Sequence, residues 1–343
     1  MTIALSRRRF LTSAAAAFSA GATAFQATHG LAQTAPASLE VNARRIESFD
    51  PRDPSHMRYG SLEFRSGLVL TSPFRGFGGL SALRLDRKAE TFVAISDKAN
   101  WFTGRIVYKG RHLAGLADVK SAPMLDSNGR KITARGWFDS ESLAFDGSTA
   151  YVGFERVNQI VRFDFGKTGI LSRGQAMPLP PGISDLPFNK GLETLVFVPK
   201  SQPLGGTLVA ISERGLDAAG NILGFLIGGP SAGRFTVART NNYDISDATL
   251  LPSGDLLLLE RKFSFLEGVG IRIRRIPMKS VMPEAVIDGP VIFEVDLGYE
   301  VDNMEGIDTH VTEDGDTVVT MVSDDNFSMI QRTLLLQFTL VEE

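Results

Sequence analysis

The sequence contains no cysteine, which excludes disulfides, zinc–thiolate sites, iron–sulfur clusters and thiol nucleophiles. Histidine is scarce, with four residues in a chain of 343. There is no excess of positive charge, because 36 lysines and arginines stand against 39 aspartates and glutamates. We therefore expect no nucleic-acid partner. The chemistry that remains belongs to carboxylates, guanidinium groups and hydroxyls.

Several signatures of cofactor and nucleophile chemistry are also missing. The sequence has no Walker A motif, no H-E-x-x-H and no G-x-G-x-x-G between a strand and a helix, so no nucleotide or flavin cofactor is expected. A serine of the α/β-hydrolase kind needs G-x-S-x-G at a strand-to-helix turn, and residues 79–83 (G-L-S-A-L) lack the final glycine. A serine-based esterase of that kind is not indicated.

The first 32 residues have the composition of an export signal. Three arginines at 7–9 precede an alanine-rich apolar stretch over 11–25, and small residues follow at 30–32. Residues 6–12 (S-R-R-R-F-L-T) resemble the twin-arginine signal S/T-R-R-x-F-L-K, except for the final threonine. The apolar stretch is shorter than the roughly 20 residues that span a bilayer. We predict a signal peptide over 1–32, a single domain over 33–343, a periplasmic or secreted location, and no membrane span after signal removal.

Short strands dominate the chain after residue 60, and the strands recur as an internal repeat. Five units open with similar segments at 79–83, 140–144, 192–196, 246–250 and 304–308. The spacings from Ser81 to Glu141, Glu193, Asp247 and Glu305 are 60, 52, 54 and 58 residues. In each unit a second strand ends in an acid, usually followed by a base; these acids are Asp97, Glu155, Glu213, Glu260 and Asp324.

A unit of three or four strands cannot bury both its faces alone, so neighbouring units must stack. The repeat therefore predicts an all-β fold, a β-propeller of five or six blades. We expect pairing of the N-terminal and C-terminal strands to close the ring, with a final strand at 333–340, because closure removes a sheet edge. A β-sandwich and a parallel β-helix are the alternatives.

The first strand of each blade lines the central channel of a propeller, so repeated acids on these strands converge at one mouth. Glu141, Glu193, Asp247 and Glu305 are the predicted inner set, and the five acids of the second strands lie beside them. Nine carboxylates near one axis cannot all stay charged without compensation. The compensation could be a salt-bridged ring made by Lys98, Arg156, Arg214 and Arg261, or calcium, which takes oxygen ligands, or a mixed site for a phosphate ester.

Two further segments have alternative interpretations. Arg272, Arg274 and Arg275 alternate with isoleucines, which predicts one solvated strand face opposite an apolar face. Residues 263–266 (F-S-F-L) follow Arg261 and either form a pocket wall at the mouth or pack against a neighbouring blade.

Six segments together resemble the secreted phytase-like family described by the phrase "esterase-like activity of phytase". They are residues 77–83 (F-G-G-L-S-A-L), 93–97 (V-A-I-S-D), 139–143 (D-S-E-S-L), 191–195 (G-L-E-T-L), 208–214 and 303–307 (N-M-E-G-I). The resemblance covers about residues 60–343. It implies a propeller and an extracytoplasmic hydrolase that acts on a phosphate ester or another ester.

The combined expectation is a calcium-assisted hydrolase of a phosphate or carboxylic ester at the acidic axial mouth. In this interpretation the catalytic residues are Glu141, Glu193 and Glu305, the substrate-binding residues are Lys98, Arg156, Arg214 and Arg261, and the metal ligands are Asp97, Glu213, Asp247, Glu260 and Asp324. The competing hypothesis is a non-catalytic periplasmic propeller that binds a ligand or protein partner and uses ions as structural supports.

Overall fold

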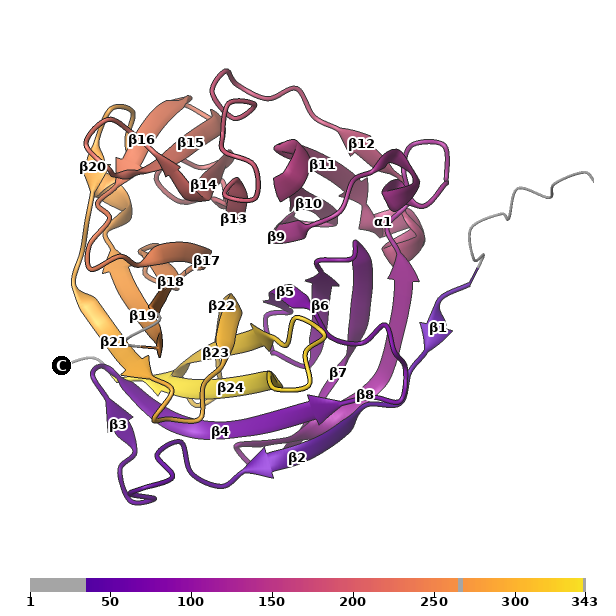
Figure 1. The fold of residues 1–343 in the computed structure, drawn as a ribbon, viewed down its shortest axis with the longest axis vertical. Coiled ribbons are helices and arrows are strands. Elements are labelled where there is room, and N and C mark those ends of the chain that lie inside the picture. Colours follow the sequence, from indigo (N-terminus) through magenta and orange to yellow (C-terminus); the bar gives the residue numbers. More distant parts are fainter. Residues whose placement is uncertain (1–34, 265–267, 342–343) are drawn as a thin grey trace, which may run out of the picture. The chain divides into compact units, whose positions relative to one another are not determined.

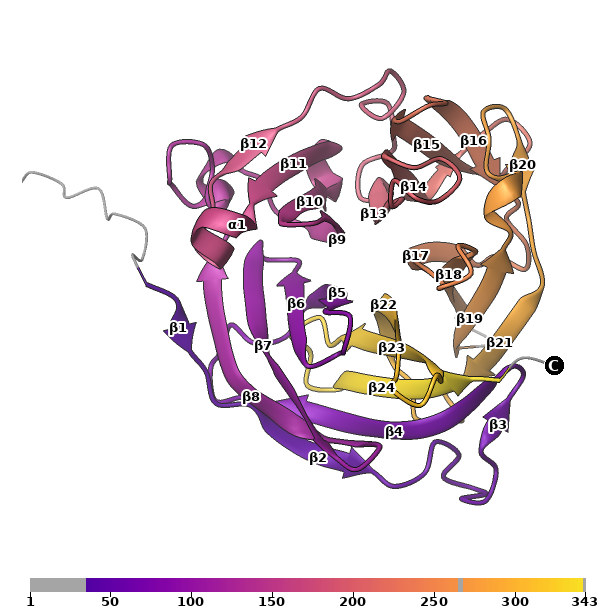
Figure 2. The same cartoon turned by 180° about the vertical axis from the view of Figure 1, so that it is seen from behind.

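Five sheets surround a common axis in this protein, which a computed structural model describes over residues 35–264 and 268–341 (Figure 1). Each sheet has one strand nearest the axis and its other strands progressively farther out, as the reverse view in Figure 2 also shows. The predicted all-β propeller is confirmed, with five blades. The predicted signal peptide lies outside the described residues.

The first three blades follow the chain in order. Blade 1 contains β5 (Leu80–Leu85), β6 (Thr91–Ser96), β7 (Asn100–Lys109), β8 (His112–Pro123) and the edge strand β1 (Ala37–Ser38). Blade 2 contains β9 (Ser140–Asp146), β10 (Thr149–Phe154), β11 (Gln159–Asp164) and β12 (Gly174–Ala176). Blade 3 contains β13 (Leu192–Phe197), β14 (Thr207–Leu216), β15 (Ile222–Gly228), β16 (Gly233–Val237) and the short strand β20 (Val286–Ile287).

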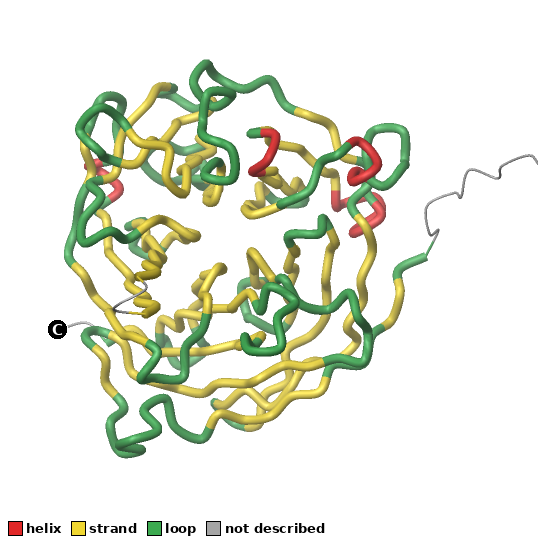
Figure 3. Tube along the Cα trace, viewed as in Figure 1, coloured by secondary structure: helices red, strands yellow, loops and turns green. Residues whose placement is uncertain are grey.

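The last two blades follow in order, and blade 5 also takes in N-terminal strands. Blade 4 contains β17 (Asp244–Leu250), β18 (Leu256–Ser264), β19 (Gly268–Ile276) and β21 (Val291–Asp296). Blade 5 contains β22 (Asn303–Val311), β23 (Thr317–Asp324), β24 (Thr333–Leu340), β4 (Leu62–Thr71), β2 (Asn42–Ile46) and β3 (Arg58–Tyr59). Helical turns are confined to connections (Figure 3). They are α1 (Phe165–Thr168) and the 3₁₀ turns Ile132–Arg135, Glu155–Val157, Gly169–Leu171 and Met278–Ser280.

An N-terminal strand and the C-terminal strand pair in blade 5. Strand β4 pairs antiparallel with β24, from Leu62 opposite Leu340 to Leu70 opposite Thr333. The other edge of β4 is covered by β2. This pairing confirms the predicted closure, and it leaves no unpaired edge on β24.

The apolar core is divided among the five interfaces between blades. Strand β18 shows why its sequence is a run of four leucines. Leu256 and Leu258 face blade 3, whereas Leu257 and Leu259 face blade 5, and all four are fully buried. A strand that is buried on both faces shows no alternation of polar and apolar residues. Each such leucine stabilises the fold by roughly 1.5–3 kcal/mol.

Among the described residues, we find no helix long and apolar enough to cross a bilayer. Residues 32–343 form one compact unit by their contacts, so a single body carries every site considered below.

Candidate functional site

A β-bulge interrupts the first strand of every blade at its channel-mouth end. One residue of each inner strand has no partner in the ladder; these residues are Ser81, Glu141, Glu193, Ser246 and Glu305. A bulge redirects the side chain of the extra residue. The repeated segment therefore places three glutamates, from blades 2, 3 and 5, at one mouth of the channel.

A second position at the same mouth lies on or directly after β6, β10, β14 or β23, one residue after the residue that pairs with the inner strand just before its bulge. Asp97, Glu155, Glu213 and Asp324 occupy this position in blades 1, 2, 3 and 5. We call these four acids, with Glu141, Glu193 and Glu305, the acidic mouth. The predicted convergence of acids on one mouth is present for these seven residues.

Blade 4 departs from the repeat, and the predicted alignment of its first strand was wrong by one residue. Ile245 pairs with Glu260 and Asp247 pairs with Leu259, so the bulged residue is Ser246 and not Asp247. The position held by an acid in the other blades is held by Arg261 in blade 4. The predicted metal ligands Asp247 and Glu260 consequently point away from the acidic mouth.

Glu260 lies in a buried ion cluster. Its carboxylate accepts hydrogen bonds from Arg272 Nε at 2.8 Å and from Arg274 Nε at 2.8 Å, and both arginine side chains are 1% exposed. Arg272 also stacks on Tyr243, and Arg274 pairs with Asp288. The prediction of a solvated arginine face is wrong for Arg272 and Arg274, because Glu260 compensates both charges inside the blade.

Asp247 forms the second buried pair, deep in the channel. Both of its oxygens accept from Arg84, at 2.7 and 2.8 Å, and one also accepts from the backbone N–H of Ile307. The Arg84 guanidinium further donates to carbonyls of blades 1, 3, 4 and 5, those of Leu83, Leu195, Ala248 and Ile307. Arg84 therefore lies across the channel and ties these four blades together.

The tightest group in the acidic mouth is formed by Glu155, Glu193 and Glu213. One carboxylate oxygen from each lies within 4.8 Å of the other two, and all three residues are buried. Glu155 accepts from the backbone N–H of Gly191 at 3.0 Å. Glu193 is 4% exposed, and its carboxylate has no hydrogen-bonding or ionic partner among the described residues.

Two cations compensate part of this charge. Arg261 contacts Glu305 at 2.8 Å and Glu213 at 3.4 Å, and Lys190 contacts the other oxygen of Glu213 at 2.5 Å. Burial opposes the charge of Arg261, but Glu305, Glu193 and Glu213 outweigh it and raise the pKa of that guanidinium. Seven acids with two paired cations leave a strong negative excess.

The excess shows in the pKa values of the acids. Burial, with Glu141 next in effect, raises the pKa of Glu193 well above its usual range. Burial and the neighbouring Glu213 raise the pKa of Glu155 to about 7. Burial also raises the pKa of Glu305 to about 7, although Arg261 opposes it, and that of Asp324 to about 8. The mouth therefore holds protons near neutral pH unless another cation replaces them.

Two acids of the mouth lack partners besides Glu193. Glu141 is half-buried and has no hydrogen bond or ion pair in the described chain, and burial together with Glu305 raises its pKa well above the usual range. Asp97 has a buried oxygen without a partner, and burial raises its pKa to about 6. Buried polar groups without a hydrogen-bond partner are rare, so these acids need a physical explanation.

The other predicted substrate-binding residues form a rim outside the acids. Arg156 pairs with Asp139, and Arg214 pairs with Asp244. Lys98 lies over the ring of Phe327. Of the predicted cations, Arg261 alone contacts the acidic mouth among the described residues, so the proposed salt-bridged ring is not formed.

A cavity of 610 Å³ adjoins the acidic mouth on the side of blades 3, 4 and 5. Its lining includes Glu213, Arg261, Lys190 and Phe263. Phe263 is 79% exposed, so the interpretation of this segment as a pocket wall is correct for that residue. Residues 265 and 266 lie outside the described residues.

Sequence reasoning missed Lys190 and Arg84, although both have a positional signal. Lys190 lies three residues before the bulged Glu193, and Arg84 lies three residues after the bulged Ser81. Residues 229–233 (G-P-S-A-G) match G-x-S-x-G, a match that sequence reasoning missed as well. They connect the antiparallel strands β15 and β16, so no strand-to-helix elbow is present there.

Comparison with known proteins gives one family. The family model described as "Esterase-like activity of phytase" matches residues 75–327, more than half of the chain. No curated protein matches.

Similar solved structures include other propellers and enzymes. The β-propeller domain of Cps50 (Swd1) from Myceliophteria thermophila is 12% identical, with a TM-score of 0.35, over 74% of this chain and 67% of that one. A putative oxidoreductase (glucose dehydrogenase) from Thermus thermophilus is 14% identical, with a TM-score of 0.36, over 87% and 99%. Glutaminyl cyclase from Myxococcus xanthus is 10% identical, with a TM-score of 0.39, over 77% and 92%. At these values the likenesses carry no argument about activity.

Proposed function

Because this chain belongs to the phytase-like family described as "Esterase-like activity of phytase", we propose that it hydrolyses a phosphate or carboxylic ester at its acidic mouth. The proposal includes a divalent cation, calcium, held by Glu155, Glu193 and Glu213. The observation that carries it is the approach of three buried carboxylate oxygens within 4.8 Å of one another. Glu193 in this group has no protein partner among the described residues.

The donor set suits a hard cation. Calcium takes six to eight oxygen ligands, and this mouth offers carboxylates with no thiol and no imidazole in the group. Lys190 and Arg261 both contact Glu213, and the charge of Arg261 also acts on Glu193. A bound divalent cation would supply Lewis-acid polarisation of the ester oxygen and would lower the pKa values that burial now raises.

The chain's own residues supply the remaining steps. Arg261 lines the adjoining cavity and lies beside Glu213, so it is placed to bind the oxygen that gains negative charge. Glu141, which has no partner in the described chain, is the proposed general base that takes a proton from the attacking water. Asp324, whose pKa burial raises to about 8 in the cation-free protein, is the proposed acid for the leaving alcohol.

We also infer that the protein works outside the cytoplasm. The support is the resemblance of residues 6–12 to a twin-arginine signal. Fusing residues 1–32 to a reporter that folds in the cytoplasm, with and without Arg7→Lys and Arg8→Lys, tests this inference. We expect periplasmic reporter only with the arginines, and export that persists without them contradicts the route.

The activity is tested with purified protein and two chromogenic esters, p-nitrophenyl phosphate and p-nitrophenyl acetate. We expect turnover of at least one ester, loss of turnover after chelation with EDTA, and recovery with calcium chloride. Glu193→Gln should lower kcat by more than about 100-fold, because it removes a charged cation ligand without changing the side-chain volume.

Glu63→Gln on the exposed face of β4 is the matched control, and its kcat should equal that of the natural protein. Turnover that EDTA and Glu193→Gln both leave unchanged contradicts the proposal. A melting temperature that EDTA lowers, with no ester turned over, would instead support the non-catalytic ligand-binding propeller.

A further inference from the structure

The 610 Å³ cavity beside the acidic mouth is lined by two chemically different groups of side chains, one charged and one apolar. Glu213 belongs both to the cation-binding group and to the cavity lining, so the cavity opens directly onto the proposed reaction site. Arg261 and Lys190 lie on the same side, toward the channel axis. The ester group of a substrate would therefore lie at this polar end.

The lining of the cavity also includes four apolar side chains, those of Phe263, Val269, Leu297 and Ile330. These residues come from the β18–β19 hairpin, the segment after β21, and the β23–β24 connection. Phe263 is 79% exposed, Leu297 54% and Ile330 91%. Neighbouring apolar side chains held in water around a cavity mark a binding surface rather than a core.

The charge of the cavity limits how many anionic groups a ligand can carry. Its lining holds four cations, Lys190, Arg214, Arg261 and Lys262, against three acids, Glu213, Asp244 and Asp302. Arg214, Arg261 and Lys190 already contact protein carboxylates. Glu155, Glu193 and Glu305 lie immediately behind this lining, so the field becomes negative toward the axis. One bound divalent cation offsets about one phosphate group, and a polyol with many phosphates would meet repulsion.

From the charged and the apolar lining residues we infer that the substrate is an ester of an apolar alcohol, alkyl or aryl, with no more than one anionic group. The inference rests on the proposed function and names the substrate class of the same site. Water adds its oxygen to the phosphorus or acyl carbon, the bond to the alcohol oxygen breaks, and the alcohol leaves with a proton. The alcohol's apolar part lies against Leu297, Ile330 and Phe263 throughout.

A binding experiment tests the ligand class without requiring turnover. We would titrate methyl-, butyl- and hexylphosphonate, which are not hydrolysed, into the protein in calcium chloride and measure Kd by calorimetry. Each methylene that becomes buried should tighten binding by up to about fourfold. Leu297→Ser and Ile330→Ser should each weaken hexylphosphonate about tenfold and leave methylphosphonate within twofold.

Met282→Ser is the control, because Met282 is 50% exposed and does not line the cavity. It should leave all three Kd values unchanged. A Kd that does not depend on chain length, or that responds equally to Met282→Ser and Ile330→Ser, overturns the inference.

Turnover distinguishes this inference from the proposed function. With calcium, kcat/KM for 1-naphthyl phosphate or 1-naphthyl acetate should exceed that for inositol hexakisphosphate by more than about tenfold. Faster release of phosphate from inositol hexakisphosphate supports hydrolysis and overturns the apolar substrate class. Chain-length-dependent binding of phosphonates, with no ester turned over, supports the ligand class and overturns hydrolysis.

Discussion

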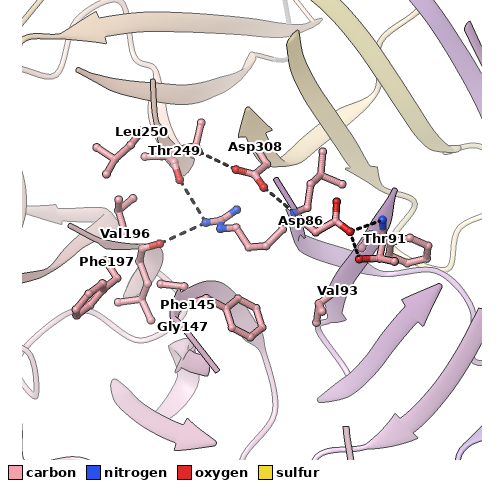
Figure 4. A pocket seen from close by; sticks show the side chains of 16 residues that line it. Asp86, Thr91, Val93, Phe145, Gly147, Val196, Phe197, Thr249, Leu250 and Asp308 are labelled. Carbon is pink, nitrogen blue, oxygen red and sulfur yellow. Dashed lines mark hydrogen bonds between the residues drawn. The ribbon is translucent and has the colours of Figure 1, made fainter. Parts of the chain in front are cut away.

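The two ends of the central channel differ in whether their buried carboxylates have partners. At the acidic mouth Glu193 and Glu141 have none among the described residues, and one oxygen of Glu305 is also unpaired. At the opposite end a cavity of 430 Å³ is lined by Asp308 and Arg84, and their neighbours satisfy them (Figure 4). Asp308 accepts from the backbone N–H of Leu85 and from the Thr249 hydroxyl.

The acids at one end of the channel are satisfied by neighbouring groups, whereas several acids at the other end have no partner in the described chain. Buried polar groups are nearly always hydrogen-bonded, so each exception needs a reason. Asp247 and Asp308 hold neighbouring blades together and would gain little from a further ligand. Glu193 accepts no hydrogen bond and forms no ion pair within the described chain, and burial raises its pKa well above the usual range. The carboxylates with partners therefore lie at one end of the channel, and the carboxylates without partners lie at the other.

The largest loss of stability is expected from a substitution at the end of the channel where the carboxylates have partners. Arg84→Met leaves Asp247 buried without a counter-charge and leaves four carbonyls without a shared donor. Removing one partner of a buried ion pair costs about 3–5 kcal/mol. We expect the free energy of unfolding in urea to fall by this amount at pH 7.

The control for Arg84→Met is Arg105→Met, which removes an exposed ion pair with Asp118. It should cost less than about 1 kcal/mol. Adding Asp247→Asn to Arg84→Met should recover part of the loss, because the buried charge is then removed. Equal losses from Arg84→Met and Arg105→Met would contradict the role of Arg84 as the tie across the channel.

The internal repeat of the sequence predicts both the five-bladed framework and the acidic mouth. Turn residues and the spacing of the repeated segments define the five inner strands, and an apolar run such as residues 256–259 marks a strand buried on both faces. The repeat also predicts Glu141, Glu193 and Glu305, because a bulge recurs wherever the segment recurs.

What the sequence does not reveal is the register of blade 4. The dipeptide Glu260-Arg261 has the same sequence as residues 155–156 and 213–214. Glu260 nevertheless pairs directly with Ile245 of the inner strand. Side chains alternate along a strand, so a shift of one residue exchanges the two faces. Only the partner strand shows this shift. The burial of Arg272 likewise depends on Glu260, twelve residues away in sequence, and no local pattern contains that information.

The second prediction concerns the pH dependence of stability, which the acids of the acidic mouth should dominate. In the folded state burial raises the pKa of Asp97 to about 6, that of Glu155 to about 7 and that of Asp324 to about 8. These acids ionise at lower pH in the unfolded chain, at about 4 to 4.5. Stability without calcium should therefore be greatest below about pH 4.5, as far as these groups are concerned, and should decline up to about pH 8.

This decline can be measured by thermal unfolding in EDTA between pH 5 and pH 8. Asp324→Asn should stabilise the calcium-free protein at pH 8 by about 1–2 kcal/mol, because it removes a buried charge and keeps an acceptor for the Asn326 N–H. Calcium should flatten the pH dependence. Asp314→Asn, at an exposed turn, is the control and should change nothing. A calcium-free protein more stable at pH 8 than at pH 5 would contradict the raised pKa values.

The smallest loss of stability is expected at the rim, where the ion pairs are partly exposed to water. Arg156 pairs with Asp139, and its side chain is 46% exposed. Water screens such a pair, so Arg156→Ala should lower the free energy of unfolding by less than about 1 kcal/mol. Urea denaturation at 50 mM and 500 mM sodium chloride measures this directly, and the difference between the two proteins should shrink at high salt. A loss above about 2 kcal/mol that salt leaves unchanged would show that Arg156 compensates buried charge, as the salt-bridged ring requires.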